Sequence, residues 1–266
     1  VDEAQDIPPG ISVIIPALNE ESRVAATVES VLEGFNTEAI VVDGGSSDQT
    51  GETARKAGAA VYTADPGRAL QMNLGARQAT GDILLFLHAD SALPPEWDCH
   101  VREIIKQPGT VLGHFGFMIS GSFPGRRWVE FGTNMRARFL KMPYGDQGLF
   151  LLRNDFLDMG GFPEVPVMED VFLVKQAKKQ GRVRCANAGL ATSGRRWMKY
   201  GVIRTTLVNQ AVLAAAWLGA DLNELQDAYR TGMIPVSALM KNYGTKENYG
   251  TKAAEHKPDR YNRKEK

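Results

Sequence analysis

Acidic side chains at two places in the sequence have the residue types and spacing for metal binding or catalysis. Asp90 follows an apolar run at 83–87, and Glu169 and Asp170 are neighbours at the start of a predicted helix. Because Mg²⁺ and Mn²⁺ prefer hard oxygen ligands, Asp90 could hold a divalent cation. A helix N-terminus can keep one carboxylate of the pair ionised, as a base that takes a proton from a hydroxyl requires. A turn at Asp90 and simple helix capping by the pair are the alternatives.

The elements that would position these residues alternate regularly in the first part of the chain. Runs with strand character occur at 11–15, 39–43, 59–62 and 83–87, and helical patterns at 24–32, 49–57 and 68–79 separate them. This order, with short connections, predicts an α/β fold with a mostly parallel sheet between helices. Ligands of such sheets bind beyond the carboxyl ends of the strands. Polar residues follow each predicted strand there: Asn19, Asp43, Asp65 and Asp90.

The rest of the sequence is less regular. We expect a strand at 111–119, a helix near 128–140, a helix from 168 through 179 and a short strand at 183–185. Asn-Tyr-Gly-Thr-Lys occurs twice near the C-terminus, at 242–246 and 248–252, followed by a charged end. This composition predicts a low-complexity, disordered tail.

The ordered set of motifs resembles family 2 glycosyltransferases of the GT-A fold over roughly residues 11–230. The motifs are Pro16-Ala17-Leu18-Asn19-Glu20, Val41 to Thr50, Phe86 to Asp90, and Met168-Glu169-Asp170. Two further segments are most similar to a bacterial-type subgroup found beside radical-SAM and selenodomain proteins. These are Gly145-Asp146-Gln147-Gly148 and Gly194-Arg195-Arg196-Trp197.

The resemblance implies a Rossmann-like, mostly parallel central sheet flanked by helices, with a smaller acceptor-side region. We accordingly expect four parts: a lead-in at 1–10, a nucleotide-sugar-binding half at 11–110, an acceptor-side catalytic half at 111–232 and a tail at 233–266.

The resemblance also implies a donor site for a nucleotide-sugar, with UDP favoured over GDP. Asp43 matches the residue that accepts a hydrogen bond from uracil, with capping of its own loop as the alternative. Arg195 matches a guanidinium that could bind the diphosphate, and Arg68 could meet the same group or remain solvated. The other expected donor contacts are Pro16, Ala17, Asn19, Glu20, Asn73, His88 and Ala89. Asp48 precedes a predicted helix and is interpreted as its N-cap.

The implied reaction is metal-assisted, inverting sugar transfer to a hydroxyl acceptor. A diphosphate leaving group needs positive charge, which Mn²⁺ or Mg²⁺ on Asp90 would supply. Asp90 matches the second position of an Asp-x-Asp motif, whereas His88 occupies the first and departs from the pattern. His88 could bind ribose or phosphate, or join the metal shell. Asp170, beside Glu169, matches the usual base.

Three more residues resemble positions that contact the acceptor or the donor sugar. Asp146 and Gln147 lie between a Gly-rich turn and a strand. Trp197 could stack on a sugar face, or it could simply pack beside a surface basic pair. A GT-A-like nucleotide-sugar-binding protein without turnover is the non-enzyme alternative, and His88 is the feature that favours it.

Composition and missing motifs exclude other classes. Lys plus Arg and Asp plus Glu both number 31, which argues against a nucleic-acid partner. The loop at 16–20 has no glycine, so a dinucleotide-binding fingerprint is absent, and so is a P-loop. A sugar-nucleotide pyrophosphorylase would need a Gly-rich loop there.

No apolar run reaches the roughly 20 residues of a membrane span. We expect a cytoplasmic protein, and the apolar segment at 202–218 has two interpretations. It could be a buried core helix, or it could make peripheral contact with a membrane surface.

Overall fold

The computed structural model describes residues 7–235, and these form two compact units. The first unit extends to Val202 and holds the sheet, and the second begins at Ile203. The predicted tail lies largely outside the described residues, as does most of the predicted lead-in. The expected division near residue 110 stays a prediction.

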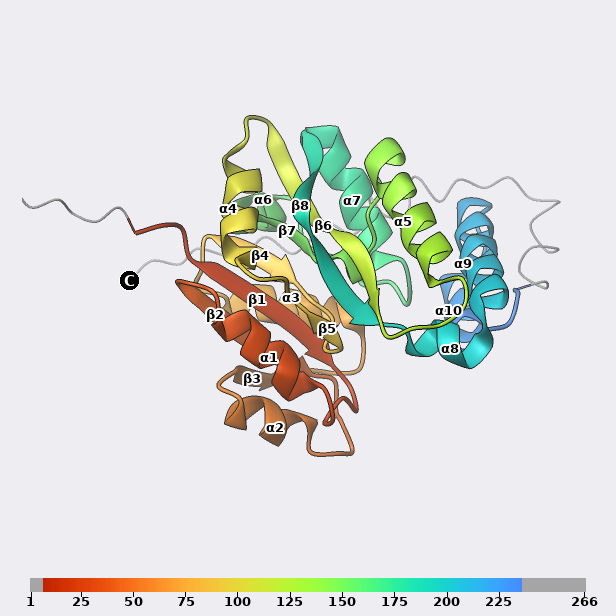
Figure 1. The fold of residues 1–266 in the computed structure, drawn as a ribbon, viewed down its shortest axis with the longest axis horizontal. Helices are drawn as coiled ribbons and strands as arrows, with labels where there is room; N and C mark the ends of the chain where they lie inside the picture. Colours follow the sequence, from red (N-terminus) through yellow and green to blue (C-terminus); the bar gives the residue numbers. More distant parts are fainter. Residues whose placement is uncertain (1–6, 236–266) are drawn as a thin grey trace, which may run out of the picture. The chain divides into compact units, whose positions relative to one another are not determined.

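The first part of unit one alternates strands and helices as the sequence predicts (Figure 1). The β-branched and aliphatic runs of the inner strands are largely buried on both faces, whereas the strand at 60–63, at the sheet edge, is only partly buried. The segments between the strands form helices. The elements are β1 Ile11–Ala17, α1 Val24–Leu32, β2 Thr37–Asp43, α2 Thr50–Lys56, β3 Ala60–Thr63, α3 Arg68–Gln78 and β4 Ile83–Phe86.

The later part of unit one adds strands of both directions and further helices. In chain order these are β5 Ser91–Ala92, α4 Trp97–Lys106, β6 Thr110–Ser120, α5 Arg126–Leu140, the short 3₁₀ helix η1 Gly145–Gln147, β7 Leu149–Leu152, α6 Arg153–Asp158, α7 Glu169–Gln180, β8 Arg182–Ser193 and α8 Arg195–Tyr200. The predicted strand at 111–119 and the predicted helices at 128–140 and 168–179 are confirmed within a few residues.

All eight strands join one sheet in the order β3-β2-β1-β4-β7-β6-β8-β5. β1 to β4 are mutually parallel, so their carboxyl ends share one edge. β7 runs antiparallel between β4 and β6, and β6 pairs parallel with β8. The segments that follow β1, β2, β3 and β4 therefore start from the same edge of the sheet.

Helices bury both faces of the sheet. α1, α2 and α4 pack on the face that carries Val13, Ile15 and Leu85. α3, α6 and α7 pack on the opposite face, which carries Ile14 and Leu84. Successive strand residues enter opposite cores because side chains alternate along a strand.

One strand is much longer than its sequence pattern predicts. The expectation was a short strand at 183–185, but β8 has 12 residues and pairs with β6 through Thr192 and Ser193. Residues 186–193 include Asn187 and Gly189, which have low strand propensity. Pairing with β6, rather than local preference, makes this segment a strand.

Unit two contains α9 Val202–Trp217 except for its first residue, and α10 Leu222–Thr231. The predicted core helix at 202–218 is only half buried: Thr205, Val208 and Val212 are buried, whereas Ile203 and Leu207 are exposed. α10 begins at Asp221, whose side chain accepts a hydrogen bond from Asn223 N. Among residues 7–235, no helix is long and apolar enough to cross a membrane.

Candidate active site

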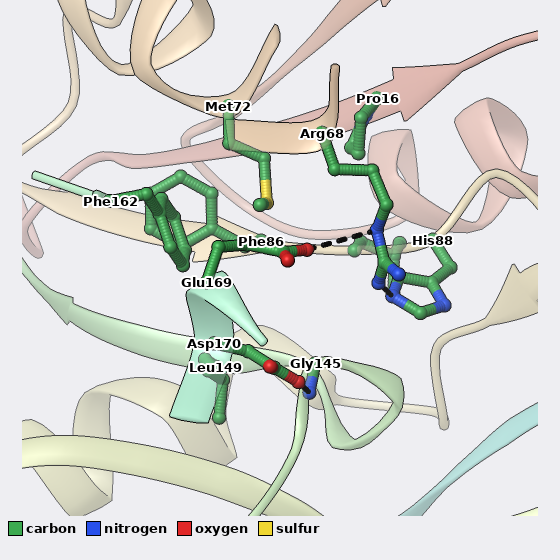
Figure 2. Close-up of a pocket in the computed structure, with 11 residues that line it drawn as sticks. Pro16, Arg68, Met72, Phe86, His88, Gly145, Leu149, Phe162, Glu169 and Asp170 are labelled. Atoms are coloured by element: carbon green, nitrogen blue, oxygen red, sulfur yellow. Dashed lines mark hydrogen bonds and ion pairs between the residues drawn. The ribbon is translucent and has the colours of Figure 1, made fainter. Parts of the chain in front are cut away.

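A small cavity opens at the carboxyl edge of the parallel strands (Figure 2). β1 and the segment after β4 contribute one wall, α3 a second, and the N-terminus of α7 with the turn before β7 a third. The lining residues are Pro16, Arg68, Met72, Phe86, Leu87, His88, Gly145, Leu149, Phe162, Glu169 and Asp170. Five predicted site residues, Pro16, Arg68, His88, Glu169 and Asp170, therefore meet at one place.

Arg68, at the first position of α3, joins two of these residues (Figure 2). Its Nη2 lies 2.7 Å from His88 Nε2, and its Nε lies 3.3 Å from Glu169 Oε1. Burial, and then the charge of Arg68, lower the pKa of His88 to about 4. His88 is therefore a neutral imidazole whose Nε2 accepts a hydrogen bond from the Arg68 guanidinium.

Glu169 is the buried partner of Arg68. Its side chain is only 4% exposed, while that of Arg68 is 44% exposed. Burial raises the pKa of Glu169 and Asp170 adds to that rise, whereas Arg68 opposes it. Arg68 thus compensates a carboxylate at the base of the cavity and keeps part of its guanidinium toward solvent.

Asp170 is held by the backbone. Its Oδ2 accepts a hydrogen bond from Gly145 N at 2.6 Å, and its Oδ1 accepts one from Val171 N at 2.8 Å. Met168, before α7, has φ of 69°, a left-handed conformation that is uncommon for a side chain of this size. This turn places the first residues of α7 at the cavity, with Asp170 directed toward Gly145 (Figure 2).

Gly145 has little room around it. A Cβ at this position would lie 3.3 Å from Asp170 Oδ2 and 3.3 Å from His88 Nε2. A larger residue could therefore fit only if these groups moved apart.

Asp90 lies beside a second cluster of charges. Arg195 Nη2, at the start of α8, lies 2.8 Å from Asp90 Oδ2 and 2.7 Å from Glu20 Oε1. Burial opposes the positive charge of Arg195, but its hydrogen bonds to Glu20 and Asp90 prevail and raise its pKa. Three predicted site residues from distant parts of unit one thus meet.

Asp43 and Asn19 shape the loops after β2 and β1. Asp43 Oδ1 accepts hydrogen bonds from Ser46 N at 2.9 Å and Ser46 Oγ at 2.6 Å. Asn19 has φ of 55°, and its Oδ1 accepts from Ser47 N at 2.9 Å. Asp43 therefore caps its own loop through Oδ1, as the alternative interpretation of this residue expected. Asp43 Oδ2 lies beside Gly51, where a Cβ would come within 3.3 Å of it.

Asp48 stabilises the start of α2, although it is not the N-cap as predicted. Gln49 occupies that position, and Asp48 Oδ1 accepts from Thr50 N at 3.0 Å. The carboxylate therefore reaches the helix start from one residue further upstream.

Gln71 is a positioning residue that the sequence did not reveal. Its side chain is buried, and its Nε2 donates to Ala17 O at 2.9 Å and Val42 O at 2.8 Å. It fastens the ends of β1 and β2 from α3, just before the loops that carry Asn19 and Asp43. A glutamine within a helical pattern gives no signal for such a contact.

Asn73, an expected donor contact, forms a structural clamp. Its Oδ1 accepts from Phe162 N at 2.9 Å, and its Nδ2 donates to Phe162 O at 2.8 Å. Phe162 lines the cavity, with its ring 4.7 Å from that of Phe86. Asn73 therefore fixes a wall of the cavity.

The segment before β7 packs tightly beside Asp170. Gln147 is fully buried, and its Nε2 donates to Phe115 O at 3.2 Å. Asp146 Oδ1 is buried and has no hydrogen-bond partner among the described residues. Burial raises the pKa of Asp146 to about 6, with Arg136 opposing and Asp170 adding to the rise. The guanidinium carbon of Arg136 lies 3.4 Å from the centre of the Tyr144 ring.

Trp197 is half-buried in α8, and its ring centre lies 5.9 Å from that of Phe117. Ala17 is buried at the end of β1, and Ala89 is buried between His88 and Asp90. The carbonyl oxygen of Ala17 accepts a hydrogen bond from Gln71 Nε2, and that of Ala89 accepts one from Thr27 Oγ1.

The oxygen donors at Asp90 fit a hard divalent ion. Within residues 7–235, no group of three or more His, Cys, Asp or Glu side chains is arranged to hold a metal.

Comparison with known proteins gives a consistent family assignment. Residues 12–160 match the family described as Glycosyl transferase family 2. A 4,4'-diaponeurosporenoate glycosyltransferase of Staphylococcus haemolyticus is 42% identical over 106 residues, which are 36% of this chain and 28% of the relative. A dolichol-phosphate mannosyltransferase of Pyrococcus furiosus is 31% identical over 166 residues, which are 56% of this chain and 47% of the relative. The chain thus matches less than half the length of either relative.

Two solved structures share the fold. A mannosyltransferase from Pyrobaculum calidifontis in complex with GDP-Man and Mn²⁺ has a TM-score of 0.59 at 18% identity, covering 91% of this chain and 77% of that one. Glucosyl-3-phosphoglycerate synthase from Mycobacterium tuberculosis with Mn²⁺, UDP and glucosyl-3-phosphoglycerate has a TM-score of 0.56 at 18% identity, covering 90% and 82%. At this identity the likeness supports the fold, and the expected GT-A architecture is confirmed.

Proposed function

Because this chain belongs to glycosyl transferase family 2, we propose that it transfers a sugar, with inversion, from a nucleoside diphosphate to a hydroxyl acceptor. UDP is the favoured nucleotide. The observation that carries the proposal is the placement of Asp170 at one cavity with Arg68 and His88, while Asp90 follows His88 at the same strand edge. A base, a cation and a metal-competent carboxylate are the groups that a displacement at a sugar carbon requires.

The donor nucleotide would bind over the ends of β1 and β2. Asp43 Oδ2 would accept the uracil N3–H, since the loop hydrogen bonds use Oδ1. Pro16, Ala17 and Asn19 would frame the base and ribose. Two solved structures that share the fold are complexes with GDP-Man and with UDP, which supports a nucleotide as the ligand.

The diphosphate would lie between Arg68 and Arg195. Glu20 and Asp90 balance the charge of Arg195, and Glu169 balances that of Arg68. His88 would orient the Arg68 guanidinium through Nε2. Its Nδ1 would contact a phosphate or ribose oxygen. Mn²⁺ or Mg²⁺ on Asp90 would supply positive charge to the leaving diphosphate.

Asp170 would act as the general base. Two backbone N–H groups hold its carboxylate in one orientation, and it borders the cavity. Glu169 is buried against Arg68, so its role would be to position that arginine. A base within hydrogen-bond reach of the acceptor hydroxyl takes the proton as the new glycosidic bond forms.

Residues 111–232 would form the acceptor-side half, and residues 11–110 the donor half. Asp146 and Trp197 would contact the acceptor or the donor sugar, while Gln147 would hold their loop through Phe115. The segments at 145–148 and 194–197 support placement in the subgroup found beside radical-SAM and selenodomain proteins.

Peripheral contact with a membrane is the last part of the proposal. The names of two relatives include a lipid phosphate, dolichol phosphate in one and undecaprenyl phosphate in the other. Exposed apolar residues of α9, such as Ile203 and Leu207, are compatible with contact at a membrane surface.

Donor hydrolysis tests the proposal without knowledge of the acceptor. The chain is incubated with Mn²⁺ and a panel of UDP- and GDP-sugars, and released nucleotide is measured. We expect metal-dependent release, with UDP donors preferred. Metal-dependent nucleotide binding without release would favour the inactive alternative. If the chain showed no nucleotide binding and no release, the proposed donor site would be contradicted.

A further inference from the structure

α5 is an amphipathic helix whose apolar side faces away from the protein. Trp128 is 78% exposed, Phe131 60% and Phe139 66%. With about 100° of rotation per residue, these three residues and Met135 fall within a stripe about 80° wide. Surface helices of globular proteins normally turn such a stripe toward the core.

The opposite side of α5 binds the protein through polar side chains. Asn134 Oδ1 accepts from Phe117 N at 2.7 Å, and Asn134 Nδ2 donates to Phe117 O at 3.0 Å. Glu130 Oε1 accepts from Ile119 N at 2.9 Å. α5 is thus anchored along β6, beside which it lies in Figure 1, by hydrogen bonds to the strand backbone. These bonds fix the outward orientation of the apolar stripe.

Cationic residues border the stripe. Arg127 and Arg138 are exposed and lie at its edge on the helix. Arg138 also lines a groove of about 1080 Å³, together with Lys141, Lys178, Arg182 and Arg184, and no lining residue is Asp or Glu. The chain as a whole has a formal net charge of zero, so the positive lining of this groove is a local feature.

From this combination we propose that α5 docks the protein on an anionic phospholipid surface. Aromatic rings take positions at the headgroup level of a bilayer, and apolar side chains enter its acyl boundary. Arg and Lys beside them pair with anionic headgroups. A nucleic-acid backbone would use the cations but would leave the aromatic stripe exposed.

Docking through α5 would hold the candidate active site near the membrane. Four residues, Lys141 to Tyr144, connect α5 to Gly145, so this link spans at most about 18 Å. Arg136 of α5 packs over the Tyr144 ring and joins helix and loop. An acceptor presented from the bilayer would then meet Asp170 from the α5 side, a consequence that rests on the proposed function.

Vesicle flotation without any donor tests the docking surface separately from catalysis. The probes are vesicles of phosphatidylcholine with phosphatidylglycerol, and vesicles of phosphatidylcholine alone. We expect the protein to float with the anionic vesicles at low salt and to be released by high salt. The triple variant Trp128→Ser, Phe131→Ser, Phe139→Ser should bind at least about tenfold more weakly.

Phe35→Ser is the matched control, because Phe35 is 66% exposed outside α5; it should bind like the unmodified chain. Brominated lipids should quench the tryptophan fluorescence of the bound protein. The quenched part should be the fluorescence of Trp128, which is missing from the Trp128→Phe variant. The proposal is overturned if the unmodified chain does not float, or if the triple variant floats equally well. It is also overturned if Ile203→Ser with Leu207→Ser abolishes binding instead, or if the stripe proves to join two copies in sedimentation experiments.

Discussion

The two carboxylates of the proposed mechanism, Asp170 and Asp90, are held in different ways. Backbone N–H groups of Gly145 and Val171 hold Asp170. A side chain, Arg195, contacts Asp90 from 105 residues away and contacts Glu20 as well. A backbone-held carboxylate is fixed, as a base aimed at one hydroxyl should be. A carboxylate paired with a flexible arginine can exchange that partner for a metal and a diphosphate.

Asp170→Asn should have the largest effect on turnover. The amide has the same size but cannot take a proton, and it keeps only one of the two backbone hydrogen bonds, so sugar transfer should fall by about 10³-fold. Nucleotide affinity, measured by calorimetry, should stay within about twofold of the unmodified protein. Equal loss of nucleotide binding would show that Asp170 has a structural role.

Asp90→Asn should have a different effect. The amide is a poorer ligand for Mn²⁺ than a carboxylate, so metal affinity in the presence of UDP should fall by about 100-fold. Electron paramagnetic resonance of Mn²⁺ measures the bound fraction directly. Unchanged Mn²⁺ binding would show that Asp90 is not a ligand of the metal.

Gly145→Ala should displace the Asp170 carboxylate and should lower turnover less than Asp170→Asn does. The added Cβ would press on Asp170 Oδ2 and His88 Nε2, and the displaced base should lower kcat by about tenfold with little change in Mn²⁺ affinity. Gly132→Ala is the control, because a Cβ there meets nothing within 4 Å. If both variants behaved alike, the tight packing at Gly145 would have no catalytic consequence.

Asp146→Asn should have the smallest effect, visible in stability. Burial raises the pKa of Asp146 from 3.8 to about 6, so ionisation is costly in the folded protein. The contribution of this group to stability is therefore largest near pH 4 and is lost as pH rises through about 6. The variant should melt about 2–4 °C higher than the unmodified protein above pH 7, and no higher at pH 4. A shift that is the same at every pH would argue against the titration of Asp146.

The sequence predicted which residues lie at the carboxyl edge of the parallel strands. Asn19, Asp43 and Asp90 follow buried runs with strong strand character, and regular alternation with helices implies parallel strands. Their carboxyl ends therefore had to share an edge.

The contacts that complete the site were not predictable in the same way. Arg195 meets Glu20 across 175 residues, and Gln71 joins two strand ends from a helix. Neither contact leaves a local pattern in the sequence. Asn73, a predicted donor contact, also clamps Phe162, and a helix position alone does not say which neighbour a side chain meets.

The separate roles of Asp90 and Asp170 can be measured in one experiment. UDP is titrated calorimetrically, with and without Mn²⁺, into the unmodified chain, Asp90→Asn and Asp170→Asn. We expect Mn²⁺ to strengthen UDP binding to the unmodified chain and to Asp170→Asn, but not to Asp90→Asn. Mn²⁺-strengthened binding to all three proteins, or to none of them, would contradict this expectation.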